Sequence, residues 1–179
     1  MSLKKVTNRA IFLDRDGVIN VDKQYVSQIE NFEFTEGIFD LLRTLQEMGY
    51  LLIVITNQSG IGRGYYTLED FQKLTEWKLD QLKQRGITIH KVYYCPHSPE
   101  SHCDCRKPSP KMLLDAQKQF NIDMKHSWMV GDKKSDIEAG QKAGVGKTVF
   151  IKNGEKEEPL ADYSVDRVSE IEVLVKQFG

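Results

Sequence analysis

Long apolar runs and an excess of charge of either sign are both missing from this sequence. No stretch approaches the roughly 18 consecutive apolar residues of a membrane-spanning helix. The 179 residues carry 25 Lys and Arg against 26 Asp and Glu, a net charge of −1. The basic surface that is typical of nucleic-acid-binding proteins is therefore not expected. We expect a protein that binds neither a membrane nor a nucleic acid.

Cysteine is scarce, and its placement is informative. The chain has three Cys, and all of them lie between Cys95 and Cys105. An odd and clustered set is a poor disulfide framework but is typical of a metal site. Reduced thiols of this kind, together with the lack of a secretion-signal pattern at the start of the sequence, predict a location in the cytoplasm.

Apolar segments of strand length alternate with helical patterns along the chain. Apolar runs predict strands at residues 9–13, 51–55, 91–94, 127–130, 148–152 and 163–165. Helical spacing predicts helices at residues 37–48, 67–86, 109–120, 136–143 and 168–178. This alternation indicates an α/β fold, a doubly wound and mostly parallel sheet with helices on both faces. We expect one domain over residues 1–179, and a monomer.

The first candidate for chemistry follows the first predicted strand, at Asp14-Arg15-Asp16-Gly17. Two carboxylates two residues apart repel one another, and a dication between them relieves that repulsion. Magnesium takes oxygen ligands and combines few carboxylates with waters and substrate phosphate. An Asp side chain can also act as a nucleophile toward phosphorus. Taken alone, this pair fits a solvated loop as well as it fits a site.

Further polar clusters follow the later strands. Thr56-Asn57 offers a hydroxyl and backbone N–H groups for a phosphoryl oxygen, although such residues more often cap helices or form turns. Lys107 offers a compact cation, and Gly131-Asp132 supplies a third strand-end carboxylate. Asp136 either caps the following helix or orients Lys107. Since ligands bind beyond the carboxyl ends of parallel strands, convergence of these groups favours a phosphate and magnesium site.

In this order the clusters resemble the four motifs of the haloacid dehalogenase (HAD) superfamily of phosphatases, which share a Rossmann-like three-layer α/β/α fold. The resemblance implies that Asp14 is both the nucleophile and a magnesium ligand. It implies that Asp16 protonates the departing oxygen and then activates water, while its backbone carbonyl contacts the metal. Thr56 and Lys107 would hold the phosphoryl group, and Asp132 would complete the protein ligands of magnesium.

A second metal site is predicted in the loop that follows the third strand. Cys95-Pro96-His97 and Cys103-Asp104-Cys105 supply three thiols and an imidazole. Cys95, His97, Cys103 and Cys105 would form a closed, structural zinc site that leaves no position for water. His102 is a rival ligand, although Pro96 suggests a tight turn that favours His97. The alternative is a set of scattered buried cysteines.

The zinc loop narrows the resemblance to the D,D-heptose 1,7-bisphosphate phosphatases and their relatives, the histidinol-phosphate phosphatases. Segments 14–22, 25–26, 56–64 and 129–133 favour the heptose branch. The short interval between His97 and Cys103 is instead similar to the histidinol branch. Gln24 stands where the heptose pattern has Gly, which leaves the shape of the turn at residues 22–25 open.

The heptose resemblance implies removal of the 7-phosphate of D-glycero-D-manno-heptose 1,7-bisphosphate, in ADP-heptose and lipopolysaccharide core biosynthesis. The implied substrate contacts are Asp22, Lys23, Gln24, Tyr25, Asn57, Gln58, Ser59, Arg106 and Lys133. Arg106 would grip the distal phosphate bidentately. The motifs leave no room for a large cap domain, so an open site is expected. The alternatives are a histidinol-phosphate phosphatase of histidine biosynthesis and a non-catalytic, zinc-stabilised binding module.

Overall fold

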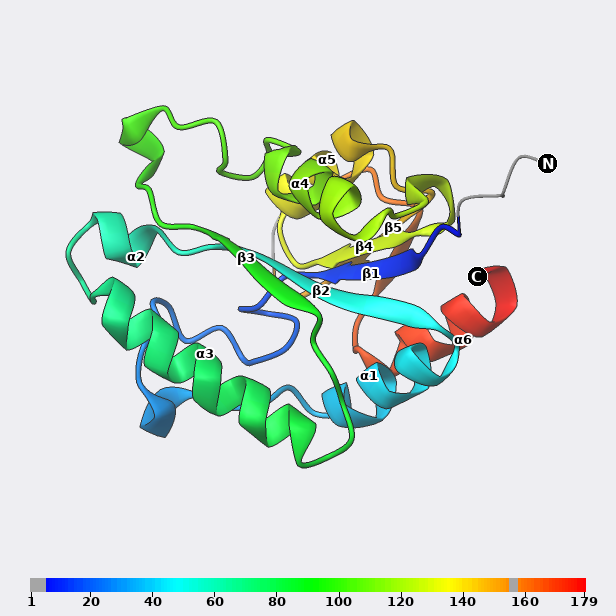
Figure 1. Cartoon of the computed structure of the whole chain (residues 1–179), viewed down its shortest axis with the longest axis horizontal. Coiled ribbons are helices and arrows are strands. Elements are labelled where there is room, and N and C mark those ends of the chain that lie inside the picture. The colour runs from blue at the N-terminus through cyan, green and yellow to red at the C-terminus, as the bar shows by residue number, and fades with distance from the viewer. Residues whose placement is uncertain (1–5, 155–157) are drawn as a thin grey trace.

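Six parallel strands form one sheet at the centre of the molecule (Figure 1). The computed structural model describes residues 6–154 and 158–179. The strands are β1 (Arg9–Leu13), β2 (Tyr50–Asn57), β3 (Lys91–Cys95), β4 (Trp128–Gly131), β5 (Lys147–Ile151) and β6 (Tyr163–Val165). Their order across the sheet is β3-β2-β1-β4-β5-β6, and each pair of neighbours runs parallel.

Helices cover both faces of this sheet (Figure 1). One face packs against α1 (Ile38–Glu47), α3 (Leu68–Lys83) and α6 (Ser169–Phe178), and the other against α4 (Lys111–Phe120) and α5 (Lys134–Ala143). Because successive side chains of a strand point to opposite faces, β1 contributes to both cores. Ile11 and Leu13 join the core beside α1, whereas Ala10 and Phe12 join the core beside α4. The predicted three-layer α/β/α fold is confirmed.

The predicted elements are present, with shifted ends. The strand predicted at residues 51–55 is longer, because Tyr50 pairs with Arg9 and Asn57 pairs with Cys95. The helix predicted from residue 109 begins at Lys111, so Pro110 caps it instead of occupying its first turn. The helix predicted from residue 136 begins two residues earlier, as α5. Four short helices were not predicted: α2 (Ser59–Gly62), η1 (Ile29–Asn31), η2 (Pro99–Ser101) and η3 (Met124–His126).

Helix α3 begins at a capping box, as its sequence predicts. The backbone N–H of Asp70 donates to Thr67 Oγ1 at 3.1 Å, and the backbone N–H of Thr67 donates to Asp70 Oδ2 at 2.9 Å. These two bonds satisfy donors that the first turn of a helix leaves unpaired. They also fix the segment just before Thr67, which borders the site described below.

The strand order reverses beside β1, since β2 and β4 lie on its two sides. In open parallel sheets this reversal opens a crevice at the carboxyl ends of the strands. β1, β2 and β4 all end at this edge, and each is followed by one of the polar clusters of the sequence. Among the described residues, no helix combines the length and apolar character that a membrane crossing requires.

Candidate active site

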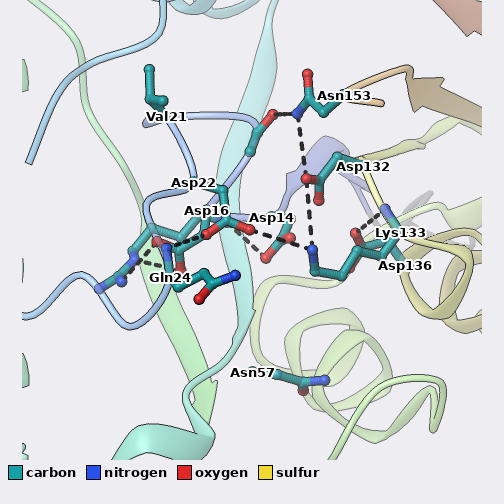
Figure 2. A network of polar contacts seen from close by, with 12 residues as sticks. Asp14, Asp16, Val21, Asp22, Gln24, Asn57, Asp132, Lys133, Asp136 and Asn153 are labelled. Atoms are coloured by element: carbon teal, nitrogen blue, oxygen red, sulfur yellow. Dashed lines mark hydrogen bonds and ion pairs between the residues drawn. The ribbon is translucent and has the colours of Figure 1, made fainter. Parts of the chain in front are cut away.

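A cavity of about 420 Å³ opens at the carboxyl ends of β1, β2 and β4. Most of the residues predicted for the site line it: Asp14, Asp16, Asp22, Gln24, Tyr25, Asn57, Gln58, Ser59, Arg106, Lys107, Lys133 and Asp136. Tyr66 and Ser135 also line it and were not predicted. Residues far apart in the sequence therefore meet in one concave, mostly polar space, of which Figure 2 shows the carboxylate side.

Asp14 lies at the base of the cavity, immediately after β1. Its Oδ1 accepts hydrogen bonds from the backbone N–H of Arg15 at 2.8 Å and from Lys107 Nζ at 3.0 Å. Its other oxygen, Oδ2, has no donor in the part of the chain that the structure describes. Burial, followed by the charge of Asp136, raises the pKa of Asp14 well above its ordinary value. A buried carboxylate with one free oxygen is placed to attack an electrophile in the cavity.

Lys107 is a buried cation held directly beside Asp14. Its Nζ donates to Asp14 Oδ1 at 3.0 Å, to Asp136 Oδ1 at 2.6 Å and to the backbone oxygen of Ile55 at 2.8 Å. Burial alone would lower its pKa, but the charges of Asp136 and Asp14 raise it above the ordinary value. Lys107 therefore stays protonated and provides a fixed positive charge at the nucleophile.

Asp136 makes both of the contacts that the sequence left as alternatives. Its Oδ1 accepts from Lys107, and its Oδ2 accepts from the backbone N–H of Lys133 at 3.1 Å, at the start of α5. The side chain is 1% exposed. The same carboxylate therefore caps a helix, a contact with Lys133 that Figure 2 shows, and orients Lys107 beside Asp14.

The structure supplies a test of whether magnesium fits this site. Carboxylate oxygens of Asp14, Asp132 and Asp136 lie within 4.8 Å of one another. The oxygens of Asp136 are engaged as described above, whereas the buried Asp132 Oδ1 has no hydrogen-bond partner among the described residues. Burial, followed by the charge of Asp136, raises the pKa of Asp132 to about 6. A dication would satisfy the unpaired oxygen and relieve this repulsion, so the residues fit magnesium.

Gly17 leaves room for the Asp132 carboxylate. Gly17 has a φ of +88°, and a Cβ placed on it would lie 1.9 Å from Asp132 Oδ2. Glycine is therefore required here both by the backbone conformation and by the close approach of the carboxylate. Asn153, which the sequence did not single out, donates to Asp132 Oδ2 at 3.3 Å and to the Gly17 carbonyl at 2.8 Å (Figure 2).

The Asp16 carboxylate faces Arg15 and lies apart from the three carboxylates. Arg15 donates to it twice, from Nε at 3.0 Å and Nη2 at 2.9 Å. Asn20 donates at 3.0 Å and Gln58 at 3.2 Å. Burial alone would raise the pKa of Asp16, but Arg15 and these hydrogen bonds together lower it. In this arrangement Asp16 is an ionised carboxylate whose charge is stabilised by Arg15, Asn20 and Gln58.

Arg15 is another residue of this site that sequence reasoning missed. Its side chain is almost fully buried, and its Nη2 also donates to the backbone oxygen of Val26 at 2.7 Å. Arg15 thus links the end of β1 to the loop at residues 21–34. A sequence signal was available, because a charged residue inside Asp14-Arg15-Asp16 has two acidic neighbours to pair with.

Two predicted substrate residues, Asn57 and Lys23, and the predicted catalytic residue Thr56 make other contacts in the structure. Asn57 uses both ends of its amide on the backbone of Lys107, with distances of 3.2 and 3.0 Å. Lys23 pairs with Glu33 at 3.0 Å and does not line the cavity. Thr56 is fully buried, and its Oγ1 accepts from Gln58 Nε2 at 2.8 Å without lining the cavity.

The turn at residues 22–25 has a left-handed backbone. Gln24 has a φ of 60° and Tyr25 a φ of 53°. This is the conformation that glycine adopts most easily, so the Gly of the heptose pattern is replaced by Gln without a change of turn direction. Asp22 closes the turn by accepting from the backbone N–H of Gln24 at 2.9 Å, and it reaches Lys133 Nζ at 3.4 Å.

The four predicted zinc ligands lie together at the end of β3. The Sγ atoms of Cys95, Cys103 and Cys105 are 2.8, 3.5 and 3.7 Å apart, and His97 Nδ1 lies 3.4 Å from Cys105 Sγ. Ligands about 2.3 Å from a tetrahedral zinc ion are separated by similar distances, so this donor set fits zinc. His102, the rival ligand, is exposed and lies outside this group.

The fold, the strand-end carboxylates and the buried lysine define the class of the protein as a HAD-like hydrolase. A family model described as HAD-hydrolase-like matches residues 104–171. The crystal structure of D,D-heptose 1,7-bisphosphate phosphatase from B. bronchiseptica, complexed with magnesium and phosphate, superposes with a TM-score of 0.88 at 26% sequence identity. That alignment covers 96% of this chain and 99% of the other.

Curated relatives are more similar in sequence. A D-glycero-beta-D-manno-heptose-1,7-bisphosphate 7-phosphatase from Helicobacter pylori is 51% identical over 146 residues, which cover 81% of this chain and 84% of the relative. The protein of the same name from Escherichia coli K12 is 48% identical over 89% of this chain and 87% of its own length. The chain belongs to the family of the heptose-bisphosphate phosphatases, which confirms the resemblance drawn from the sequence.

Proposed function

We propose that the chain is a magnesium-dependent phosphatase that removes the 7-phosphate of D-glycero-β-D-manno-heptose 1,7-bisphosphate. The observation that carries this proposal is the pair formed by Asp14 and Lys107 at the base of an open cavity. Identity of 51% to a relative named for that reaction supports the choice of substrate and of the β anomer. The product, a heptose 1-phosphate, would serve ADP-heptose and lipopolysaccharide core biosynthesis.

Asp14 is the proposed nucleophile. Its Oδ2 forms a bond to phosphorus while the bond between phosphorus and O7 of the sugar breaks, and the electron pair of that bond goes to O7. Lys107 holds a positive charge beside the phosphoryl oxygens during this transfer. Magnesium, held by Asp14, Asp132 and the backbone carbonyl of Asp16, would neutralise negative charge on the phosphoryl group.

Asp16 is the proposed acid and base. Phosphate oxygens beside it raise its affinity for a proton, so Asp16 can protonate O7 as the sugar leaves. The resulting carboxylate then takes a proton from the water that attacks the phosphoryl group on Asp14. The bond between phosphorus and Asp14 breaks, which releases inorganic phosphate, restores the Asp14 carboxylate and leaves Asp16 protonated for the next cycle.

Two further cations of the cavity are suited to the second phosphate of the substrate. Arg106 and Lys133 both line the cavity, and both are cationic. Arg106 Nη1 is buried without a hydrogen-bond partner in the described part of the chain. A phosphate ester at this place would satisfy that donor, and a bisphosphate would then bind at two points. The zinc ion would act as a structural clamp that places Arg106.

The proposed setting of the enzyme follows from its chemistry. A zinc site built from three thiols persists where thiols remain reduced, which favours the cytoplasm. A complete set of proposed catalytic groups within one chain is consistent with a monomer acting on a small sugar phosphate. The same set disfavours a non-catalytic binding module, since such a module has no need of the buried Asp14 and Lys107 pair.

A substrate panel tests the proposal. Both anomers of the heptose bisphosphate, histidinol phosphate and simple sugar monophosphates are compared by kcat/KM in the presence of magnesium. We expect the β-bisphosphate to be hydrolysed fastest, with release of the 7-phosphate. Faster turnover of histidinol phosphate would replace the heptose proposal with the histidinol branch.

A pair of variants tests the nucleophile. Asp14→Asn should abolish turnover of every substrate while the protein remains folded, as judged by circular dichroism. Asp40→Asn, an exposed aspartate on α1, serves as the matched control and should retain wild-type rates. Hydrolysis by Asp14→Asn at the wild-type rate would remove Asp14 from the mechanism.

A further inference from the structure

Tyr66 lines the cavity, and the proposed reaction assigns no role to it. The residue lies between α2 and the Thr67 cap of α3, and it is 8% exposed. Its hydroxyl donates to Gln58 Oε1 at 2.5 Å. Gln58 is 3% exposed, and its Nε2 donates to Thr56 Oγ1 at 2.8 Å and to Asp16 Oδ2 at 3.2 Å. A single amide therefore connects Tyr66 to two proposed catalytic residues, Thr56 near the end of β2 and Asp16 in the turn after β1.

The direction of these hydrogen bonds is fixed by the chemistry of the groups. An ionised carboxylate only accepts hydrogen bonds, so the amide must present Nε2, and not Oε1, to Asp16. The amide oxygen then faces Tyr66, which must act as the donor. Burial raises the pKa of Tyr66 to about 12, so the hydroxyl keeps the proton that it donates.

The same direction determines how the Thr56 hydroxyl is used. Because Thr56 Oγ1 accepts from Gln58, its own hydrogen must point elsewhere. The acceptor nearest to it among the described residues is the backbone oxygen of Asn57 at 3.4 Å, which is a long contact. The fully buried Thr56 hydroxyl is thus tied to the same Gln58 amide that binds Asp16.

Tyr66 is held rigidly enough to act in this way. A Cβ on Gly60 would lie 2.1 Å from Tyr66 Cε1, so the ring packs directly against the backbone of α2. The next residue, Thr67, is fixed by the capping box of α3. The ring thus has neighbours on two helices, and its hydroxyl cannot turn away from Gln58 without moving one of them.

We propose that Tyr66 is a positioning residue for phosphoryl transfer: acting through Gln58, it holds the Asp16 carboxylate in place. This inference rests on the proposed phosphatase function and adds a residue to it. Tyr66 itself touches no reacting atom. Its removal should slow catalysis through Gln58 and through no other route.

A double-mutant cycle on kcat/KM tests this dependence. Tyr66→Phe keeps the ring and removes the donor, and we expect kcat to fall roughly ten-fold while KM changes less than about two-fold. Gln58→Ala should cost at least as much as Tyr66→Phe. In the Gln58→Ala background, Tyr66→Phe should cost nothing further, because the connecting amide is already gone. The proposal would be overturned if the fold-losses of Tyr66→Phe and Gln58→Ala multiplied in the double variant. An unchanged kcat in Tyr66→Phe would also overturn it.

Tyr93→Phe is the matched control. Tyr93 also donates its hydroxyl to a glutamine, Gln119, but this pair joins β3 to α4 and does not line the cavity. Its loss should leave kcat and KM unchanged. Thermal unfolding of each variant separates slower catalysis from a loss of folded protein.

A measurement without turnover keeps this inference separate from the proposed function. In two-dimensional NMR spectra, the side-chain amide protons of Gln58 should exchange slowly with water in the wild type and at least ten-fold faster in Tyr66→Phe. Equal exchange in the two proteins would overturn the role of Tyr66. A wild type that hydrolyses no phosphomonoester but shows this difference would overturn the proposed function alone.

Discussion

Lys78 is a charged side chain inside the apolar core, on the face of α3 that packs against the sheet. It is 1% exposed, and its Nζ has no hydrogen-bond partner among the residues that the structure describes. Burial, followed by the charge of Arg15, lowers its pKa to about 7, although the charge of Asp16 opposes the shift. Folding disfavours the protonated form of Lys78. Its burial therefore lowers the free energy of unfolding at every pH at which Lys78 is protonated in the unfolded chain.

Lys78→Met should stabilise the protein. The pKa is about 7 in the fold against an ordinary value of 10.5, so below pH 10.5 the unfolded chain binds a proton that the fold disfavours. The gain in the free energy of unfolding should be about 4 kcal/mol at pH 7 and should shrink as the pH rises toward 10.5. Urea unfolding at pH 7 and pH 9.5 measures both.

Lys73→Met, on the exposed side of the same helix, is the matched control for Lys78→Met. Lys73 pairs with Glu69 at 3.0 Å in solvent, so its replacement should leave the free energy of unfolding close to that of the wild type. Equal stability of Lys78→Met and the wild type at pH 7 would contradict the expected cost of burial.

At the level of single residues, the sequence predicted groups that act at strand ends and missed groups that depend on distant neighbours. The positions of Asp14, Lys107 and Asp136 follow from motif spacing and strand topology. The roles of Arg15 and Tyr66 depend on side chains that approach from other loops. Spacing along the chain carries no information about such contacts, and only the packed structure provides it.

The zinc loop, residues 96–106, has few apolar side chains with which to pack against the core. Residues 96–106 contain one short helix, η2, and the proposed zinc ligands lie at both ends of this loop. Arg106 and Lys107 follow the last ligand directly. Lys107 has a second anchor, since Asn57 binds its backbone, whereas Arg106 depends on the loop. Loss of zinc should therefore disturb the proposed distal phosphate site more than the nucleophile.

His97→Ala should lower zinc content well below one ion per chain and raise KM for the bisphosphate roughly ten-fold or more, with a smaller effect on kcat. The rival position provides the control, because His102→Ala should retain zinc and wild-type kinetics. Metal analysis of protein purified without chelator, combined with steady-state kinetics, checks both variants. Zinc loss in His102→Ala instead of His97→Ala would reverse the ligand assignment.

Element positions were largely predictable, and element ends less so. Runs of apolar residues located the strands, and the capping residue Thr67 located the start of α3. Both signals are local in the sequence. The added residues of β2 arise from pairing with β1 and β3, which a local pattern does not contain. The short α2 has too few residues for a periodic signal, although it carries Gly60, against which Tyr66 packs.

Across the whole molecule, stability should depend on magnesium in a way that changes with pH. The pKa of Asp132 is raised to about 6 from 3.8, so the metal-free fold binds more protons than the unfolded chain between these values. Its stability should therefore fall as the pH rises from about 4 to above 6. Magnesium binds the ionised carboxylates, so it should offset this loss above pH 6.

Thermal unfolding with and without magnesium checks this expectation. We expect a rise in Tm of about 2–5 °C on adding magnesium at pH 7.5 and a much smaller rise at pH 5. Asp132→Asn should abolish the rise, whereas the exposed variant Asp40→Asn should keep it. An equal rise at both pH values would show that magnesium does not bind at the raised carboxylates.

The contacts between Asn57 and the Lys107 backbone also affect how far the length and sequence of the zinc loop can change without loss of the fold. The backbone N–H of Gln58 donates to the Cys95 carbonyl at 2.8 Å, so both stems of the zinc loop are fastened to the end of β2. The closure cost of a loop with fixed stems grows slowly with its length. The residues between Cys95 and Lys107 can thus be lengthened, shortened or replaced as a unit. Such changes would alter substrate preference while Lys107 remains fixed beside the nucleophile.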